Sequence, residues 1–178
     1  VRDITVSKQR QEQLKIFSRF IEASNQGFGI GTLDGSVQYA NPTLLKMMAA
    51  NHIDEVVGKQ ISEFYPPELG ATFRDQIFPT VLDEGAWSGE STLVSKSGPI
   101  DVEEHYFLIR DELGNPQYIA DVITDIRERK RTRAELERLV AERTQALKER
   151  ETLLTALMDA TQDTVALVDR EGIILSIN

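Results

Sequence analysis

The chain has 178 residues, 40% of them hydrophobic and 28% charged, with no cysteine and a net charge of −9. This composition is typical of a globular protein, and the missing cysteine excludes disulfides, thiolate nucleophiles and iron–sulfur clusters. Residues 20–126 hold 17 acidic and 5 basic side chains. Because nucleic acid carries phosphates of the same sign, we expect no nucleic-acid partner.

No apolar run approaches the ~18 residues that a membrane-spanning helix needs, and no signal peptide is visible. The sequence therefore predicts a cytoplasmic segment, although its parent protein could be attached to a membrane. The chain starts at Val1 and stops within a pattern at Asn178, so we interpret it as a fragment of a longer protein.

The first elements follow from hydrophobic spacing. An amphipathic pattern predicts a helix over 6–23. Short apolar runs at 28–33 and 36–41 flank Asp34-Gly35, which predicts a β-hairpin. Pro42 suits the first turn of a helix capped by Asn41.

Short helical pieces follow Asn51 and break at Pro66-Pro67. A helix over 72–84 should bend or stop at Pro79. Alternating patterns then predict strands at 87–95, 100–110 and 117–126. The order predicts an α+β fold: a five-stranded antiparallel sheet with helices on one face, flanked by long N- and C-terminal helices.

The helix expected from about Ile126 carries a seven-residue repeat. Val140, Leu147 and Leu154 form one series, and Arg129, Leu136, Arg143, Arg150 and Leu157 form the other. This pattern favours a parallel coiled-coil dimer weakened by arginines in its seam. The alternatives are a single helix with a modest apolar stripe and a helix packed on its own domain.

Two segments recur along the chain. Residues 3–14 resemble residues 125–136, and residues 19–41 align without gaps to residues 156–178, 137 positions later. We therefore expect four parts: the tail of an upstream unit with its linker helix (1–23), a whole unit (24–126), a linker helix (127–157) and the truncated start of a further unit (158–178).

Five short motifs carry a family resemblance: LDGSVQYANP, VVGKQISEFYP, GAWSGES, SGPIDVEEHYFLIRDELGNP and VITDIRERK. In this order they resemble tandem PAS domains of bacterial sensory proteins, over nearly all of residues 24–130. The resemblance implies a small pocket between the sheet and the helices. It also implies that the helix leaving Asp125 and Ile126 carries signals to an output domain. The segment VAERTQALKERE is similar to linkers that precede the kinase core of sensor histidine kinases.

No catalytic constellation is present, so we expect no enzyme activity in this fragment. His52 and His105 lack the context of a kinase phospho-acceptor, and no metal-ligand spacing appears. PAS members that bind haem use a histidine on the helix expected here at 72–84, which has none. Photoactive flavin members need a cysteine. Haem and cysteinyl-flavin photochemistry are therefore disfavoured, a non-covalently bound flavin stays open without positive support, and the cofactor stays unknown.

Strand alternation and similarity to flavin-binding relatives place one set of side chains inward, toward the pocket. This set contains Val102, Glu104, Tyr106, Asp121 and Ile123. We expect the two acids to orient a polar or cationic ligand, or to pair with Arg74. Alternatively, the strand faces are reversed or both acids lie at the rim in water. The outer sheet face is apolar enough to need a cover, for which the helix over 6–23 of the same chain or a partner is a candidate.

The first functional hypothesis is a PAS sensor and dimerisation module of a histidine kinase, which binds a small ligand or relays an upstream signal. The alternative is a ligand-free spacer and dimer interface. A cyclic-dinucleotide synthase or a chemoreceptor remains open as the parent. The expected partners are a second copy and the adjacent PAS and output domains of the same chain.

Overall fold

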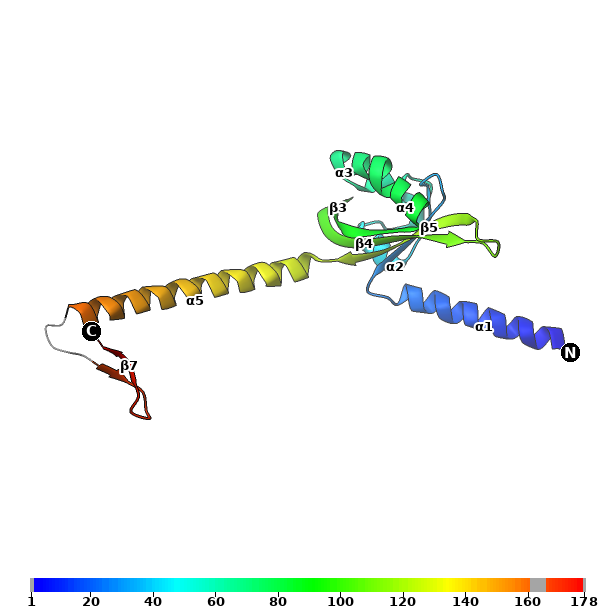
Figure 1. Cartoon of the computed structure of the whole chain (residues 1–178). Helices are drawn as coiled ribbons and strands as arrows, with labels where there is room; N and C mark the ends of the chain where they lie inside the picture. The colour runs from blue at the N-terminus through cyan, green and yellow to red at the C-terminus, as the bar shows by residue number, and fades with distance from the viewer. Residues whose placement is uncertain (1, 161–165, 178) are drawn as a thin grey trace. The chain divides into compact units, whose positions relative to one another are not determined.

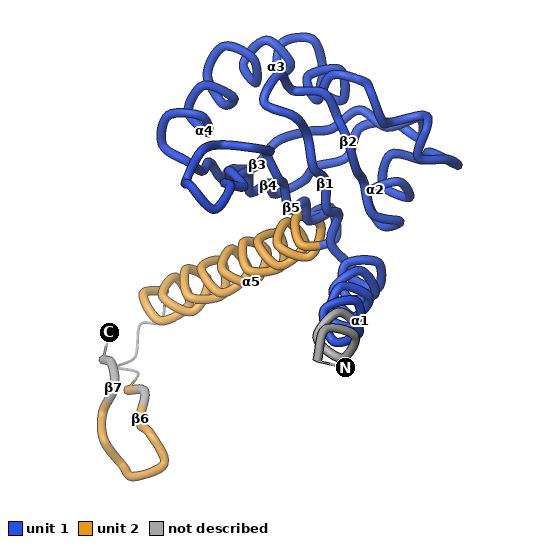
Figure 2. The backbone as a smooth tube through the Cα atoms, turned by 90° about the vertical axis from the view of Figure 1, so that its right-hand side faces the viewer, with its two compact units in different colours: residues 1–128 blue, residues 129–178 orange. Residues whose placement is uncertain are grey.

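The computed structural model describes residues 2–160 and 166–177. The chain divides into two compact units, residues 1–128 and 129–178 (Figure 2), and each is treated by itself. No helix among the described residues is long and apolar enough to span a bilayer.

Unit 1 contains a five-stranded antiparallel sheet in the order β2-β1-β5-β4-β3 (Figure 1). The strands are β1 (Gly27–Gly31), β2 (Val37–Ala40), β3 (Ala86–Ser95), β4 (Gly98–Arg110) and β5 (Pro116–Asp125). The order places the first hairpin beside the last strand, so β5 lies in the centre of the sheet. The predicted α+β fold is confirmed.

The helical segments of unit 1 are mostly short. They are α1 (Arg2–Glu22), α2 (Pro42–Met47), η1 (Ile53–Glu55), η2 (Ile61–Phe64), α3 (Pro67–Thr72), η3 (Phe73–Ile77) and α4 (Phe78–Glu84). Figure 1 shows α3 and α4 over one face of the sheet. α5 (Arg127–Asp159) begins at the end of unit 1 and continues through unit 2.

The helical segment was expected to bend or stop at Pro79; it does not stop there, but a π-helical turn interrupts it just before α4. α3, η3 and α4 follow one another without a gap, and η3 is a π-helical turn in which the Phe78 N–H donates to the Phe73 carbonyl. Proline is tolerated in the first turn of a helix, where an intrahelical N–H bond is not needed. The wider turn before α4 gives Pro79 such a position.

Asn41 caps α2 as predicted, and it also bonds to α1 and β1. Its Oδ1 accepts from the Leu44 N–H and from the Phe28 N–H, each at 2.9 Å. Its Nδ2 donates to the carbonyls of Ile21 (2.9 Å) and Gln26 (3.0 Å). This fully buried amide therefore satisfies backbone groups of α1, the chain before β1, β1 itself and α2.

The two faces of β4 and β5 differ as alternation predicts. Val102, Tyr106, Ile119 and Ile123 are buried in the core, while the outer face carries half-buried Phe107, Ile109 and Val122. α1 does not cover that outer face with its own apolar residues: Leu14, Phe17 and Phe20 are 69%, 65% and 70% exposed. Of the two predicted covers, the same-chain helix is therefore wrong, and a partner's helix remains a prediction.

Unit 2 contains the rest of α5 and a hairpin of β6 (Ala166–Val168) and β7 (Ile174–Ile177). Ala166, Leu167 and Val168 pair with Ile177, Ser176 and Ile174, with a shift at the last step. β1 and β2 show the same register and the same shift 137 residues earlier, from Gly29–Ala40 to Gly31–Val37. The turns agree too, since Gly35 and Gly172 both have φ of 85°. Val165 and Asn178, which belong to the expected further unit, lie outside the described residues.

Candidate functional site

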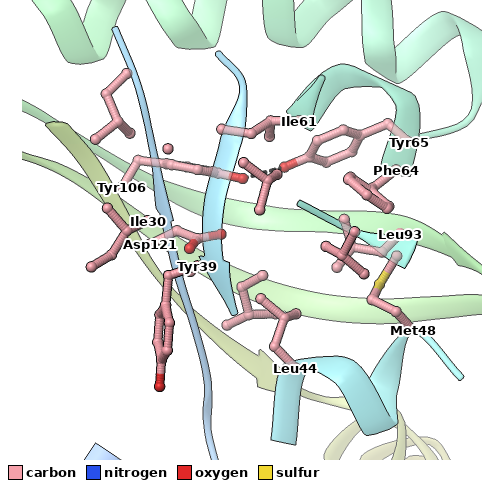
Figure 3. Close-up of a pocket in the computed structure, with 16 residues that line it drawn as sticks. Ile30, Tyr39, Leu44, Met48, Ile61, Phe64, Tyr65, Leu93, Tyr106 and Asp121 are labelled. Atoms are coloured by element: carbon pink, nitrogen blue, oxygen red, sulfur yellow. Dashed lines mark hydrogen bonds between the residues drawn. The ribbon is translucent and has the colours of Figure 1, made fainter. Parts of the chain in front are cut away.

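A cavity of about 40 Å³ lies between the inner face of the sheet and the helical segments (Figure 3). A water molecule needs ~10–15 Å³ on this measure, so the cavity has room for roughly three non-hydrogen atoms. Its wall is mainly apolar. The lining residues are Gly29, Ile30, Gly31, Val37, Tyr39, Leu44, Met48, Val56, Ile61, Phe64, Tyr65, Leu93, Tyr106, Ile119, Asp121 and Ile123.

Glu104 is a fully buried acid beside this cavity, and hydroxyl groups hold both its oxygens. Tyr65 OH donates to Oε1 at 2.7 Å, and Ser91 Oγ donates to Oε2 at 2.5 Å. The hydroxyls of Tyr65 and Tyr106 lie 2.7 Å apart. Phe73, from the π-helical turn, packs on both tyrosine rings at centroid distances of 5.2 and 5.4 Å.

Asp121 is the second acid and lies on the cavity wall. It pairs with Gly29 across the β1–β5 ladder, and a Cβ added to Gly29 would come within 2.2 Å of Asp121 Oδ1. The carboxyl group therefore occupies the space that a side chain at position 29 would fill. In Figure 3 it lies near Tyr106, while the Tyr39 hydroxyl points away from this group.

Burial controls the proton affinity of both acids. Desolvation raises the pKa of Asp121 from 3.8 to about 7; the charge of Glu104 adds to the rise, and a hydrogen bond from the Gly29 backbone opposes it. Desolvation also raises the pKa of Glu104, against the lowering effect of Ser91, Tyr65 and Tyr106. The pKa values of Tyr65 and Tyr106 rise well above 10.0, first through desolvation, so both phenols stay protonated donors.

The predicted site residues separate into three groups. Tyr106, Asp121 and Ile123 line the cavity, while Val102 and Glu104 lie in the core beside it. Arg74 is exposed on η3 and does not line the cavity. The expected pairing of Arg74 with the acids is therefore wrong, because tyrosine and serine hydroxyls hold Glu104 instead.

Sequence reasoning missed Tyr65, Ser91 and the role of the glycines in β1. Gly27, Gly29 and Gly31 face Leu44, Asp121 and Ile61, and an added Cβ would meet atoms of these side chains at 3.3, 2.2 and 3.0 Å. Glycine at every second position of a strand indicates close approach from neighbouring side chains. That spacing was the available signal for the cavity wall.

The cavity strand leads directly into the long helix. Ile126, 1% exposed, is the one residue between β5 and α5, and its N–H donates to the Asp101 carbonyl at 3.0 Å. Asp125 accepts from the Arg127 N–H at 3.0 Å and from the Arg127 Nη2 at 2.6 Å. The start of α5 is thereby fixed to β4 and β5.

The geometry also limits cofactors. Among residues 2–160 and 166–177 no group of three histidine, cysteine, aspartate or glutamate side chains could hold a metal ion. Room for roughly three non-hydrogen atoms is too small for a flavin or a haem. The residues present therefore do not fit either group.

Unit 1 is thus an α+β domain with a five-stranded antiparallel sheet, a cavity under its helices and a helix that continues its central strand. The model of the PAS fold family matches residues 21–131, and the chain belongs to this family. No curated protein gives a match.

Solved structures share the fold at low sequence identity. The PAS domain of a protein from Colwellia psychrerythraea is similar with a TM-score of 0.59 and 16% identity, over 65% of this chain and 98% of that one. The PAS domain of an HTR-like protein from Haloarcula marismortui has a TM-score of 0.56 and 18% identity, over 68% and 98%. An RNA-binding light-oxygen-voltage receptor has a TM-score of 0.59 and 18% identity, over 71% of this chain and 37% of the receptor.

Proposed function

We propose that the chain is the sensor and dimerisation module of a multidomain bacterial signalling protein, with a sensor histidine kinase as the parent and the cytoplasm as its location. One observation carries the proposal. β5 lines the cavity with Ile119, Asp121 and Ile123 and reaches α5 through Ile126 alone.

The relay would work through this short connection. A ligand against Asp121 would move or stiffen β5, and the buried Ile126 would transmit the change to the first turn of α5. Such a relay requires that the ligand bind the two states of the helix with different affinity. An upstream domain could bias the same equilibrium through α1, since the Ile21 carbonyl is bonded to Asn41.

A second copy of the chain is the proposed partner of α5. The heptad positions Leu136, Val140, Leu147, Leu154 and Leu157 are all exposed, Leu136 by 61% and Leu147 by 60%. A parallel pair of helices would bury this stripe. The shared register of the two hairpins supports the proposal that adjacent PAS units are arranged in tandem along the parent chain.

A second candidate is a ligand-free spacer and dimer interface, which the small size of the cavity favours. Native mass spectrometry of the freshly purified full chain, followed by hydrogen exchange of α5, separates the two functions. A sensor is expected to retain a small molecule, or to take up an added one, and to show changed exchange near Ile126. A chain that retains and binds nothing, with α5 exchange unaltered, would leave only the spacer.

The parent protein needs a separate test. The full-length sequence should continue with a further PAS unit and a kinase core; a cyclic-dinucleotide synthase domain in that place would support the other parent.

A further inference from the structure

The cavity is unbalanced in charge and in hydrogen-bonding groups. The carboxyl group of Asp121 lies on the cavity wall (Figure 3), and that of Glu104 is bonded to the lining residue Tyr65. The sixteen lining residues include no lysine, arginine or histidine. Buried charges in proteins are normally paired. The end of the cavity at Asp121 therefore needs positive charge, from protons or from a cation.

The neighbouring hydroxyl groups do not supply that charge. Ser91 and Tyr65 donate their protons to Glu104. The third hydroxyl, of Tyr106, lies 2.7 Å from that of Tyr65 and is also a hydrogen-bond partner of Asp121, which the Gly29 backbone bonds as well, so part of the acceptor capacity of this carboxylate stays open. What remains toward the cavity is mostly acceptor capacity: the Asp121 carboxylate and oxygen lone pairs of the tyrosines. A ligand that complements this end should donate hydrogen bonds and accept none.

The rest of the wall sets the size and polarity of the ligand. Leu44, Leu93, Ile119 and Ile123 surround the cavity away from the acids, so carbon atoms fit there and a second charge does not. Room for roughly three non-hydrogen atoms matches one nitrogen with one or two carbons.

We propose that the cavity binds a short primary alkylammonium ion, with its nitrogen against the Asp121 carboxylate and its carbons on the apolar wall. The inference rests on the proposed sensor function and specifies its ligand class. Glu104 stays a positioning residue, because its oxygens are already held by Tyr65 and Ser91. The acidic surroundings, 17 acidic against 5 basic residues over 20–126, would attract such a cation.

Ethylammonium chloride is the probe, titrated into the full chain at about pH 8, where the amine is charged and Asp121 is ionised. Trp87 is the one tryptophan of the sequence, and its ring centroid lies 6.2 Å from that of Tyr106. Its fluorescence therefore reports on this end of the cavity. We expect a saturable change with ethylammonium and none with ethanol, its neutral size match, or with sodium chloride.

Asp121→Asn should weaken binding at least about tenfold, because a charge-assisted hydrogen bond is lost. The matched control is Asp75→Asn, the same change at an exposed acid of η3, which should leave affinity unchanged. Binding to the natural chain should also weaken as the pH falls through about 7, since Asp121 then takes a proton. The groups that face Asp121 are Glu104, Tyr65 and Tyr106, and the pKa of each is raised.

Equal saturation by ethanol, or equal affinity of Asp121→Asn, would overturn the ammonium class. In either case occupancy of the cavity would leave the sensor function standing. If neither probe binds and native mass spectrometry finds no retained molecule, the ligand class and ligand sensing both fail, and the spacer remains.

Discussion

Ionised Asp121 lowers the stability of the folded state, because desolvation and the charge of Glu104 both disfavour its ionised form. Its pKa is about 7 in the folded chain against 3.8 for the ordinary group. Between these values the folded state binds a proton that the unfolded state has released. Stability from this group is therefore complete below about pH 4, declines as the pH rises to about 7 and stays low above it.

Asp121→Asn should remove that decline. We expect the variant to be more stable than the natural chain at pH 8 by about 1–3 kcal/mol, allowing for partial solvent access, and nearly equal to it at about pH 4. Urea denaturation at several pH values measures the difference, with Asp75→Asn as the control. Parallel pH profiles for the natural chain and the variant would show that Asp121 titrates normally.

Asn41 shows how much one buried amide can stabilise in this fold. It makes four hydrogen bonds to backbone groups of α1, the chain before β1, β1 and α2. Asn41→Ala should lower the free energy of unfolding by about 2–4 kcal/mol. Asn115→Ala, at an exposed turn where the amide contacts only Asp111, should lower it by less than about 1 kcal/mol. A similar loss in both variants, measured by chemical denaturation, would contradict this role.

At the scale of elements, the sequence predicted those features of the fold that neighbouring residues alone determine, such as strand faces, helix caps and turns. The alternation in β4 and β5 is a property of neighbouring residues, so it separated the two faces correctly, and similarity to flavin-binding relatives indicated that the face with Tyr106 and Ile123 is the buried one. The cap at Asn41 and the turn at Asp34-Gly35 are equally local.

Features that depend on distant contacts were not predictable in this way. Tyr65 lies 39 residues before its acceptor Glu104 in the sequence. The short helical segments around Tyr65 have no hydrophobic periodicity from which its direction could be predicted. The expectation for Arg74 failed because charge complementarity alone placed it near the acids, whereas its position on η3 is exposed. The π-helical turn before Pro79 likewise depends on how three helical segments join.

The two matching hairpins allow a comparison between equivalent glycines. Gly35 and Gly172 share a φ of 85°, but a Cβ at Gly35 would lie 3.0 Å from Gln60 Oε1, while one at Gly172 meets nothing within 4 Å. Each alanine substitution adds backbone strain of about 1 kcal/mol.

Gly35→Ala should therefore lower the melting temperature of unit 1, followed by Trp87 fluorescence, because it also displaces Gln60 from Ser36. Gly172→Ala should leave that transition unchanged, since its hairpin belongs to unit 2. An equal shift from both substitutions would mean that the two units unfold together.

At the scale of the whole molecule, the proposed output of the domain depends on association through α5. Its helical surface combines exposed leucines with Arg143 and Arg150 in the same heptad series. Arginines at core positions keep a coiled coil weak, and a weak seam can change its packing when a sensor domain changes state. A helix that acts alone would gain nothing from this arrangement.

Replacing the seam arginines tests the proposed dimer directly. Arg143→Leu with Arg150→Leu should tighten self-association at least about tenfold, because each added leucine buries apolar surface only in the dimer. Arg131→Leu with Arg138→Leu makes the same chemical change on the opposite, outward helix positions and should leave association unchanged. Sedimentation equilibrium of the full chain measures both. Unchanged association in the seam variant would reject the coiled coil, and equal tightening in both variants would show unspecific hydrophobic attraction instead of a seam.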